Sequence, residues 1–323
     1  GSRYCPECEA IDSRHKAKRA YARVKEFGVW RGEKPGGFPF VEFTVPDFLW
    51  DRFKDPKEVG RLMSVVRDSL REWYGVLREE EVEDKRTGKR KKKWVKKGDI
   101  AGLQTFHSWS SRKFPKFVPH VPVLLAGHMW RDGKRVRLRL YVKPWELRRL
   151  RRIYTRRMSE AFGFKREEVP TKDKLLNVYY GYVGKGGVLY ELDEDGKYRK
   201  MKGGLMRRLQ YMLRSPSPRR KVQGWKVLEG MSEEELRLAL GHFDLRRKVR
   251  VVRWFGLWNG EEYKKLCEEF GVEPMAWREE PDYGRCPYCG GELVFKEWAI
   301  SSPGREPEPV VVSALVRIRG PGS

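Results

Sequence analysis

Two apolar segments near the middle of the chain each contain one histidine. Residues 98–112 read GDIAGLQTFHSWSSR, and residues 118–127 read VPHVPVLLAG. Their alternating or continuous apolar character is typical of half-buried or buried β-strands. A tight connection between the two strands would bring His107 and His120 close together in space. Because two neighbouring imidazoles can begin a metal site, this part of the chain constrains both the fold and its chemistry.

The charge of the chain favours a polyanionic partner. There are 70 Lys and Arg residues against 45 Asp and Glu, which gives a net charge of +25. Such an excess is the electrostatic footprint of a phosphate-binding protein. Heat adaptation also enriches a protein in charged residues, but it enriches both signs. It therefore does not explain the excess of one sign, and we expect the partner to be nucleic acid.

Much of the positive charge is clustered, in residues 85–97, 148–157, 207–208 and 219–221. Several clusters contain a Trp or Tyr that can stack on an unpaired base. The residues that we predict to contact DNA are Lys91, Lys92, Trp94, Arg148, Arg149, Arg151, Arg152, Arg207, Arg208 and Arg214. For any one of the last three, an ordinary surface role is an equally good interpretation.

Length and hydropathy suggest one catalytic domain with small appended elements. A chain of 323 residues can bury a substantial core, and we expect a domain of about 200 residues. The predicted divisions are 1–37 (a basic segment with a Cys-x-x-Cys motif), 38–260 (the catalytic domain), 261–300 (a helix and a second Cys-x-x-Cys motif) and 301–323 (a tail or peripheral strand). No apolar run reaches the roughly 18 residues of a membrane span, so we expect a cytoplasmic protein with no membrane partner.

Four of the five cysteines form two Cys-x-x-Cys pairs, Cys5 with Cys8 and Cys286 with Cys289. In a reducing compartment this spacing favours structural zinc over a disulfide. The economical hypothesis is one four-cysteine Zn²⁺ site that joins the two ends of the chain. Two alternatives stay open: the first pair takes His15 and one more ligand, or one pair binds no metal. Cys267 lacks a partner in sequence and is interpreted as a buried small residue.

The remaining pattern predicts alternating strands and helices. A strand over Phe38–Pro46 precedes a helix that Asp47 caps, and an amphipathic helix is expected from Pro56 to Leu77. The further expected elements are an exposed hairpin or loop over 79–97, a hairpin partner of the His120 strand over 129–142, a basic helix from Pro144, two strands within 176–190, a helix within 204–216 and a strand over 248–258. The strand tyrosines 179, 180 and 182 are interpreted as core residues.

In this order, several of these segments resemble the motifs of the HUH single-strand DNA endonucleases, particularly rolling-circle plasmid replication initiators and IS91-type transposases. Residues 106–109 (FHSW) resemble a His-Thr-Trp element, and 119–125 (PHVPVLL) resemble the strand that reads His-hydrophobic-His. The end of the 38–47 segment, the helix containing Tyr211 and the Arg-rich run that ends at Leu257 resemble further motifs of the family. The resemblance covers roughly residues 38–257. The order of the motifs along the chain is stronger evidence for it than any single motif.

The resemblance implies a catalytic site. Tyr211 occupies the position of the nucleophilic tyrosine, while Ser215 stands where some members carry a second one. Pro122 occupies the second histidine of the family pair, and its ring argues for an edge strand or a bulge. A catalytic Mg²⁺ or Mn²⁺ would then be held by His107 and His120, with Glu42 or water completing its shell. His128 is about 20 Å or more from His120 along an extended strand and cannot replace it.

The resemblance also implies the fold and the reaction. We expect an α+β fold with a central antiparallel β-sheet flanked by helices, of the ferredoxin-like or RNA-recognition type, with a small zinc-binding element. The expected function is a replication initiator that nicks and rejoins single-stranded DNA through a 5'-phosphotyrosine, and a host helicase is a further candidate partner. An IS91-like transposase and a catalytically inactive DNA-binding protein are the alternatives. An RNA-directed protein is a third alternative, but the sequence shows no RNA-recognition motif.

Overall fold

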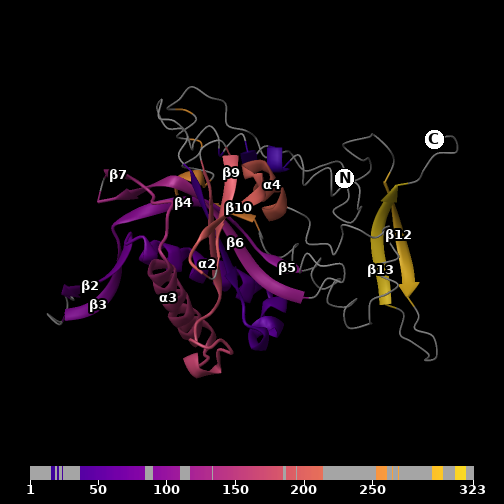
Figure 1. The fold of residues 1–323 in the computed structure, drawn as a ribbon. Helices are drawn as coiled ribbons and strands as arrows, with labels where there is room; N and C mark the ends of the chain where they lie inside the picture. The colour runs from indigo at the N-terminus through magenta and orange to yellow at the C-terminus, as the bar shows by residue number, and fades with distance from the viewer. Residues whose placement is uncertain are drawn as a thin grey trace.

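A computed structural model shows the fold of the chain (Figure 1). It describes residues 16–18, 20–21, 24, 37–83, 90–109, 117–132, 134–184, 187–193, 195–213, 252–259, 264, 268, 293–300 and 310–317. The four paired cysteines, His15, Cys267, Arg214 and Ser215 lie outside these residues. The predicted zinc element is therefore not part of the described structure.

The central element is an antiparallel sheet. Within the described residues it has nine strands, and its main path runs in the order β10-β9-β8-β1-β6-β4-β11, while β5 and β7 also pair with β6. The strands are β1 (Phe38–Thr44), β4 (Gly98–Thr105), β5 (His107–Trp109), β6 (Phe117–Arg131), β7 (Lys134–Arg137), β8 (Val178–Val183), β9 (Val188–Leu192), β10 (Tyr198–Gly204) and β11 (Val252–Phe255). The expected α+β class with a large antiparallel sheet flanked by helices is confirmed.

Helices connect the central strands. The α-helices are α2 (Pro56–Trp73), α3 (Pro144–Phe162) and α4 (Leu205–Met212), and the 3₁₀ helices are η1 (Asp47–Lys54), η2 (Arg166–Glu168) and η4 (Gly256–Trp258). The path β1-α2-β4-β6-α3-β8 gives the spatial order β8-β1-β6-β4, so two βαβ units interleave in one sheet. Two separate hairpins join β2 (Leu77–Glu83) to β3 (Arg90–Lys96) and β12 (Leu293–Ile300) to β13 (Val310–Arg317). β12 lies in the predicted segment 261–300 and β13 in the predicted segment 301–323, so this hairpin joins the two segments.

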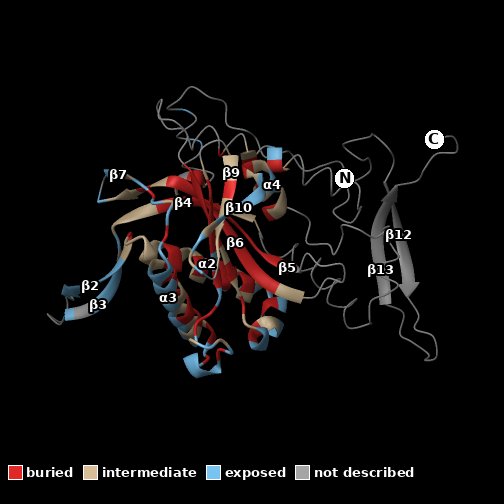
Figure 2. Ribbon diagram, viewed as in Figure 1, coloured by how far each residue is buried: buried red, intermediate tan, exposed pale blue. Residues whose placement is uncertain are grey.

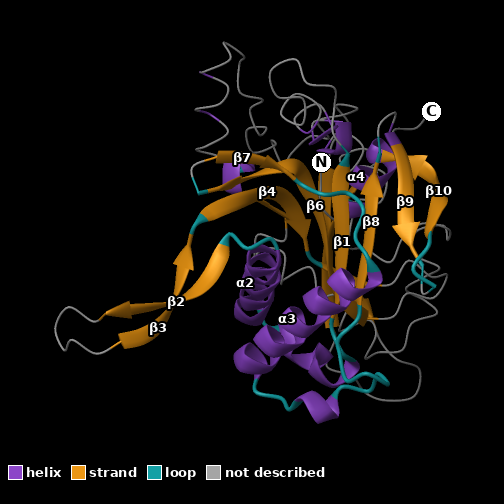
Figure 3. Ribbon diagram, turned by 60° about the vertical axis from the view of Figure 1, so that its left-hand side comes forward, coloured by secondary structure: helices purple, strands orange, loops and turns teal. Residues whose placement is uncertain are grey.

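The two faces of the sheet pack against different helices. Side chains alternate along a strand, so Val41 and Phe43 of β1 join the core formed with α2 and α3, while Phe40 joins the core formed with α4. Figure 3 shows α2 and α3 lying together against one face, and the buried residues follow the sheet in Figure 2. In the described residues around position 20, Ala17, Ala20 and Val24 also pack on the α4 face.

The strand that contains His120 is not an edge strand. β6 lies between β1 and β4, although Pro122 predicted an edge or a bulge. The pairing with β4 ends at Val123, and the pairing with β5 resumes at His120. Pro122 therefore lies beside the interruption between β4 and β5, where a missing amide hydrogen disturbs the hydrogen-bond ladder least.

Several predicted boundaries differ from the structure. β6 continues to Arg131, so residues 129–131 belong to the His120 strand, and only β7 turns back as its hairpin partner. The helix after β1 is a 3₁₀ helix that begins at Asp47, and α2 ends at Trp73 rather than Leu77. The predicted apolar face of α2 is confirmed, since Val59 and Leu62 are among its buried residues. No described helix meets the length and hydropathy needed to cross a membrane.

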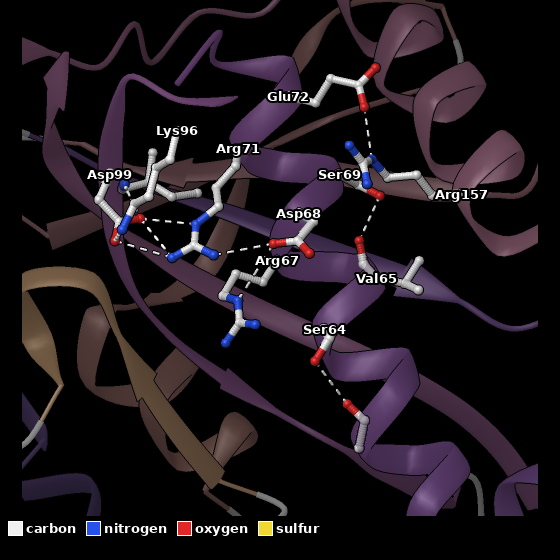
Figure 4. A network of polar contacts seen from close by, with 12 residues as sticks. Ser64, Val65, Arg67, Asp68, Ser69, Arg71, Glu72, Lys96, Asp99 and Arg157 are labelled. Atoms are coloured by element: carbon white, nitrogen blue, oxygen red, sulfur yellow. Dashed lines mark hydrogen bonds and ion pairs between the residues drawn. The ribbon is translucent and has the colours of Figure 1, made fainter. Parts of the chain in front are cut away.

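A polar network fixes the C-terminal half of α2 to the sheet (Figure 4). Arg71 of α2 binds Asp99 of β4 through two nitrogens, with Nε–Oδ1 at 3.0 Å and Nη2–Oδ2 at 3.1 Å. Asp68 and Lys96 extend the network, and the Lys96 Nζ–Asp99 Oδ2 distance is 2.6 Å. Two parallel bonds to a carboxylate fix orientation as well as distance. Since the Arg71 and Asp99 side chains are only 16% and 19% exposed, solvent screens this pair weakly.

We expect Arg71→Met to lower the free energy of unfolding by about 1 to 3 kcal/mol, because it leaves the half-buried Asp99 without its two-bond partner. Lys54→Met is the matched control. It breaks a pair in which Asp51 is 90% exposed, so it should change stability by less than about 1 kcal/mol. Urea unfolding of both variants measures the difference. Equal effects would show that the network contributes no more than a surface pair.

Candidate active site

Four polar side chains from three strands and one helix meet on the α4 face of the sheet. The Nδ1 atom of His107 lies 3.3 Å from the Nε2 atom of His120. That Nε2 atom is 3.1 Å from the phenol oxygen of Tyr211, which in turn lies 3.0 Å from Oε2 of Glu42. The structure thus brings together the predicted nucleophile and all three predicted metal ligands.

Strand register places the two histidines and the glutamate on one face. His107 of β5 pairs directly with His120 of β6, and His120 pairs on its other side with Thr44 of β1. Directly paired residues point to the same face, and so do residues two apart on one strand. Glu42 therefore shares the face of His120. Both imidazoles are buried, with 3% of His107 and 6% of His120 exposed.

The helix α4 brings Tyr211 to these strands. β10 leads directly into α4 through Gly203, whose φ of +105° favours glycine. Leu205, Leu209 and Met212 form the buried side of the helix, at the spacing of one helical face. The Tyr211 ring lies 5.2 Å from the His107 ring, centroid to centroid. Because an isolated helix of eight residues is unstable in water, packing on the sheet must hold Tyr211 in place.

Backbone carbonyls determine which nitrogen of each imidazole carries hydrogen. The Nε2 atom of His107 is 2.8 Å from the carbonyl oxygen of Met212, and the Nδ1 atom of His120 is 2.7 Å from that of Val118. A carbonyl oxygen only accepts, so each of these nitrogens donates. In the neutral rings the lone pairs then lie on His107 Nδ1 and His120 Nε2, which face each other. Two such lone pairs repel unless a cation, either a proton or a metal ion, lies beside them.

The hydroxyl hydrogen of Tyr211 has two possible acceptors. The phenol can donate to the Glu42 carboxylate or to His120 Nε2, but it has one hydrogen. Both acceptors can take up a proton, so either can remove it when the phenol attacks an electrophile. The phenol and both acceptors are within hydrogen-bond distance, which is the geometric requirement for nucleophilic chemistry.

The two imidazoles suit a divalent metal as a pair of ligands. Two ligand nitrogens bound to one ion at about 2.0–2.1 Å lie about 3 to 3.4 Å apart, and His107 Nδ1 and His120 Nε2 are 3.3 Å apart. The hydrogen bonds from the opposite ring nitrogens to carbonyls are those expected of metal-bound histidines. Within the described ranges, however, no three His, Cys, Asp or Glu side chains gather closely enough to hold a metal by themselves. Glu42 contacts Tyr211 rather than completing such a set.

Arg208 is the predicted DNA-contacting residue that lies beside Tyr211. Its guanidinium carbon is 5.7 Å from the centre of the Tyr211 ring and 4.0 Å from that of Phe40. It also forms an ion pair with Glu191, and its side chain is only 12% exposed. Arg208 therefore supplies positive potential to the site from a fixed position, partly offset by its carboxylate partner. Arg207, the preceding residue of α4, is exposed.

The other predicted DNA contacts lie away from Tyr211. Arg148, Arg149 and Arg152 are exposed on α3, while Arg151 donates to the carbonyl of Val178. On the β2–β3 hairpin, Lys92 pairs with Glu79 at 3.8 Å, and the ring of Trp94 is covered by Arg157 at 4.5 Å. Lys91 lies in β3, and Arg214 is outside the described residues. The 148–157 cluster of α3 and the β2–β3 hairpin thus meet at Trp94, whose ring contacts both Arg156 and Arg157.

The three tyrosines of β8 divide between the two faces. Tyr180 and Tyr182 are buried on the α2 and α3 face, and burial raises the pKa of the Tyr180 phenol well above its usual value. The predicted core role of these two is confirmed. Tyr179 pairs directly with Glu42, so it points to the same face as the site, and it is 53% exposed. Its expected core role is therefore wrong, because the site face of β8 is open at this position.

The features that sequence reasoning missed are largely backbone groups. The carbonyls of Val118 and Met212 orient the two imidazoles, and Thr105 Oγ1 lies 3.4 Å from His107 Nε2. A carbonyl group has no sequence signal of its own. The Arg208 ion pair depends on Glu191 of β9, which is adjacent only after the sheet has formed.

Comparisons with protein-family models, curated proteins and solved structures find no match to this chain.

We expect His107 and His120 to occupy opposite neutral tautomers, because different ring nitrogens donate to the two carbonyls. Histidine-selective ¹⁵N labelling and long-range ¹H–¹⁵N spectra would detect Nε2–H for His107 and Nδ1–H for His120, with assignment from His107→Gln and His120→Gln. The chain has only five histidines, so the signals can be resolved. Finding the same tautomer in both rings would contradict the geometry.

Proposed function

We propose that this chain is an HUH-type endonuclease that nicks and rejoins single-stranded DNA, acting as a rolling-circle replication initiator. The observation that carries the proposal is the contact of one phenol, Tyr211, with Glu42 and with His120 of a facing imidazole pair. The motif order in the sequence supports it. So does the strand order β8-β1-β6-β4, which is the ferredoxin-like arrangement of the HUH palm.

The proposed reaction is a transesterification. The Tyr211 oxygen attacks a backbone phosphorus, and the bond from that phosphorus to the 3'-oxygen breaks. Glu42 takes up the phenolic proton, while the departing 3'-oxygen takes a proton from solvent water and becomes a free 3'-hydroxyl. The 5'-phosphate stays on Tyr211 until a 3'-hydroxyl attacks it and reverses the linkage. One tyrosine suits one cleavage per site.

We further propose that His107 and His120 hold a Mg²⁺ or Mn²⁺ ion. When bound, it would polarise the phosphate oxygens and offset the charge that develops on them. The two imidazoles supply two ligands, leaving positions for phosphate oxygens and water. In this arrangement His107 from β5 takes the place of the family histidine for which this chain has Pro122. Pro122 itself shares the site face with Glu42.

Two alternatives remain within the same fold. A transposase of the IS91 type would use the same chemistry. Because Tyr211 is the one proposed nucleophile and Ser215 stands at the second tyrosine position, the initiator is favoured. An inactive DNA-binding protein would account for Pro122 and for the absence of a third ligand among the described residues. The presence of both the phenol and a proton acceptor favours an enzyme, since DNA binding alone requires neither.

We expect the wild-type protein to form a covalent adduct with end-labelled single-stranded oligonucleotides that carry candidate origins, in Mg²⁺ or Mn²⁺. The adduct should be absent in Tyr211→Phe, because phenylalanine has no attacking oxygen. Glu42→Gln should lower the cleavage rate by roughly 10²- to 10⁴-fold through loss of the proton acceptor. A denaturing gel measures both effects.

Tyr179→Phe is the matched control, because it removes another phenol on the same face. The adduct should persist in this variant. Two outcomes would contradict the proposed nucleophile. The first is an adduct that persists in Tyr211→Phe but is lost in Tyr179→Phe. The second is tight, salt-sensitive DNA binding by the wild-type protein without an adduct in either metal. The second outcome would favour the inactive binding protein.

We expect Mn²⁺ to bind through the imidazole pair, with an affinity that falls as the pH is lowered because protons compete for the same nitrogens. Binding should be lost in His107→Ala and in His120→Ala but retained in Tyr211→Phe. Mn²⁺ titration followed by electron paramagnetic resonance measures this without any DNA cleavage. Equal affinities in all four proteins would place the metal elsewhere.

A further inference from the structure

An exposed stripe along α3 combines aromatic and basic side chains. Trp145, Arg148, Arg149 and Arg152 follow the i, i+3, i+4, i+7 spacing of one helix face. The opposite side of α3 is buried against the sheet, through residues such as Leu150. Trp145 is 61% exposed, and the three arginines are exposed as well. The indole ring of Trp145 and the three guanidinium groups therefore share the solvent-facing side of α3.

The arginines of this stripe differ from those in the second half of the same helix. Arg156 binds Glu72 and Glu160, and Arg157 binds Glu72, with closest N–O distances of 2.7 to 2.9 Å. Among the residues that the structure describes, Arg148, Arg149 and Arg152 form no ion pair with a carboxylate. The positive charge of α3 is thus neutralised at one end and available at the other.

A second exposed aromatic side chain precedes the helix. Tyr141 is 63% exposed, yet its ring contacts Tyr182 at 5.2 Å and Tyr198 at 5.5 Å. These contacts hold the ring in position while leaving most of it accessible. Exposed aromatic rings and arginines are the features with which proteins bind the bases and phosphates of an unpaired strand.

The sheet edge links this surface to Tyr211. The amide nitrogen of Val142 donates to the Tyr198 hydroxyl at 2.8 Å, which ties the start of α3 to the start of β10. β10 ends the strand order of the sheet, carries the exposed Lys200 and Lys202, and continues into α4. Seven strand residues span about 20 Å. A basic edge therefore leads from the α3 face of the sheet to the α4 face.

We propose that Tyr141, Trp145, Arg148, Arg149 and Arg152 form a second binding surface for single-stranded DNA, the α3 anchor, which holds the strand away from the cleavage site. The choice of DNA as partner rests on the proposed function. The anchor itself rests on the uncompensated charge and the exposed rings, whose chemistry fits the phosphates and bases of an unpaired strand. Its separation from Tyr211 by the sheet means that binding and cleavage can be disrupted independently.

The test uses fluorescence anisotropy of a labelled oligothymidine, with every variant in the Tyr211→Phe background so that no cleavage occurs. Trp145→Ala should weaken binding roughly 5- to 100-fold, the range expected for loss of one base-stacking contact. The triple variant Arg148→Gln, Arg149→Gln, Arg152→Gln should lower the slope of log affinity against log salt by about 2, at roughly 0.7 per phosphate contact. Unfolding midpoints check that both variants are folded.

The matched control is Lys57→Gln, Lys165→Gln, Lys172→Gln, which removes three exposed cations outside the stripe. It should leave the affinity within about twofold and the slope within about 0.5 of the parent. If Trp145→Ala and the arginine triple variant both bind the oligothymidine as tightly as the parent does, the α3 anchor is not a DNA-binding surface. An acidic protein that binds the same side chains would give this result. If the anchor variants lose binding but no adduct forms with Tyr211 intact, the anchor stands and the nuclease proposal fails.

Discussion

The site depends on one strand pairing, that of His107 with His120 between β5 and β6. Side chains alternate between faces, so a slip of one residue in β5 would turn His107 toward α2 and α3. The pairing of His120 with Thr44 extends the same constraint to β1 and brings Glu42 to the shared face. Two strand registers thus assemble three polar groups inside a sheet whose other positions are mostly apolar.

The two faces of the sheet provide different kinds of support. α2 and α3 cover one face with long amphipathic helices, and Arg71 fixes α2 to the strand that precedes β5. The other face is covered in part by the short α4, and its central strands carry the buried polar groups.

The sequence was informative where the pattern is local. Apolar alternation predicted the strands of His107 and His120, and the helical period predicted the buried face of α2. The proline rule failed for β6 because the interruption that accommodates Pro122 lies in the neighbouring strands. The different states of the α3 arginines were equally hidden, since they depend on Glu72 of another helix.

The hydrogen bond from His107 to the Met212 carbonyl has a consequence for how the site assembles. Met212 follows Tyr211 directly, so the helix turn that positions the Tyr211 phenol also fixes the proton on the His107 imidazole. If α4 lifts from the sheet, the phenol and the defined state of His107 are lost in the same movement. The position of the Tyr211 phenol and the tautomer of His107 therefore depend together on the packing of one short helix against the sheet.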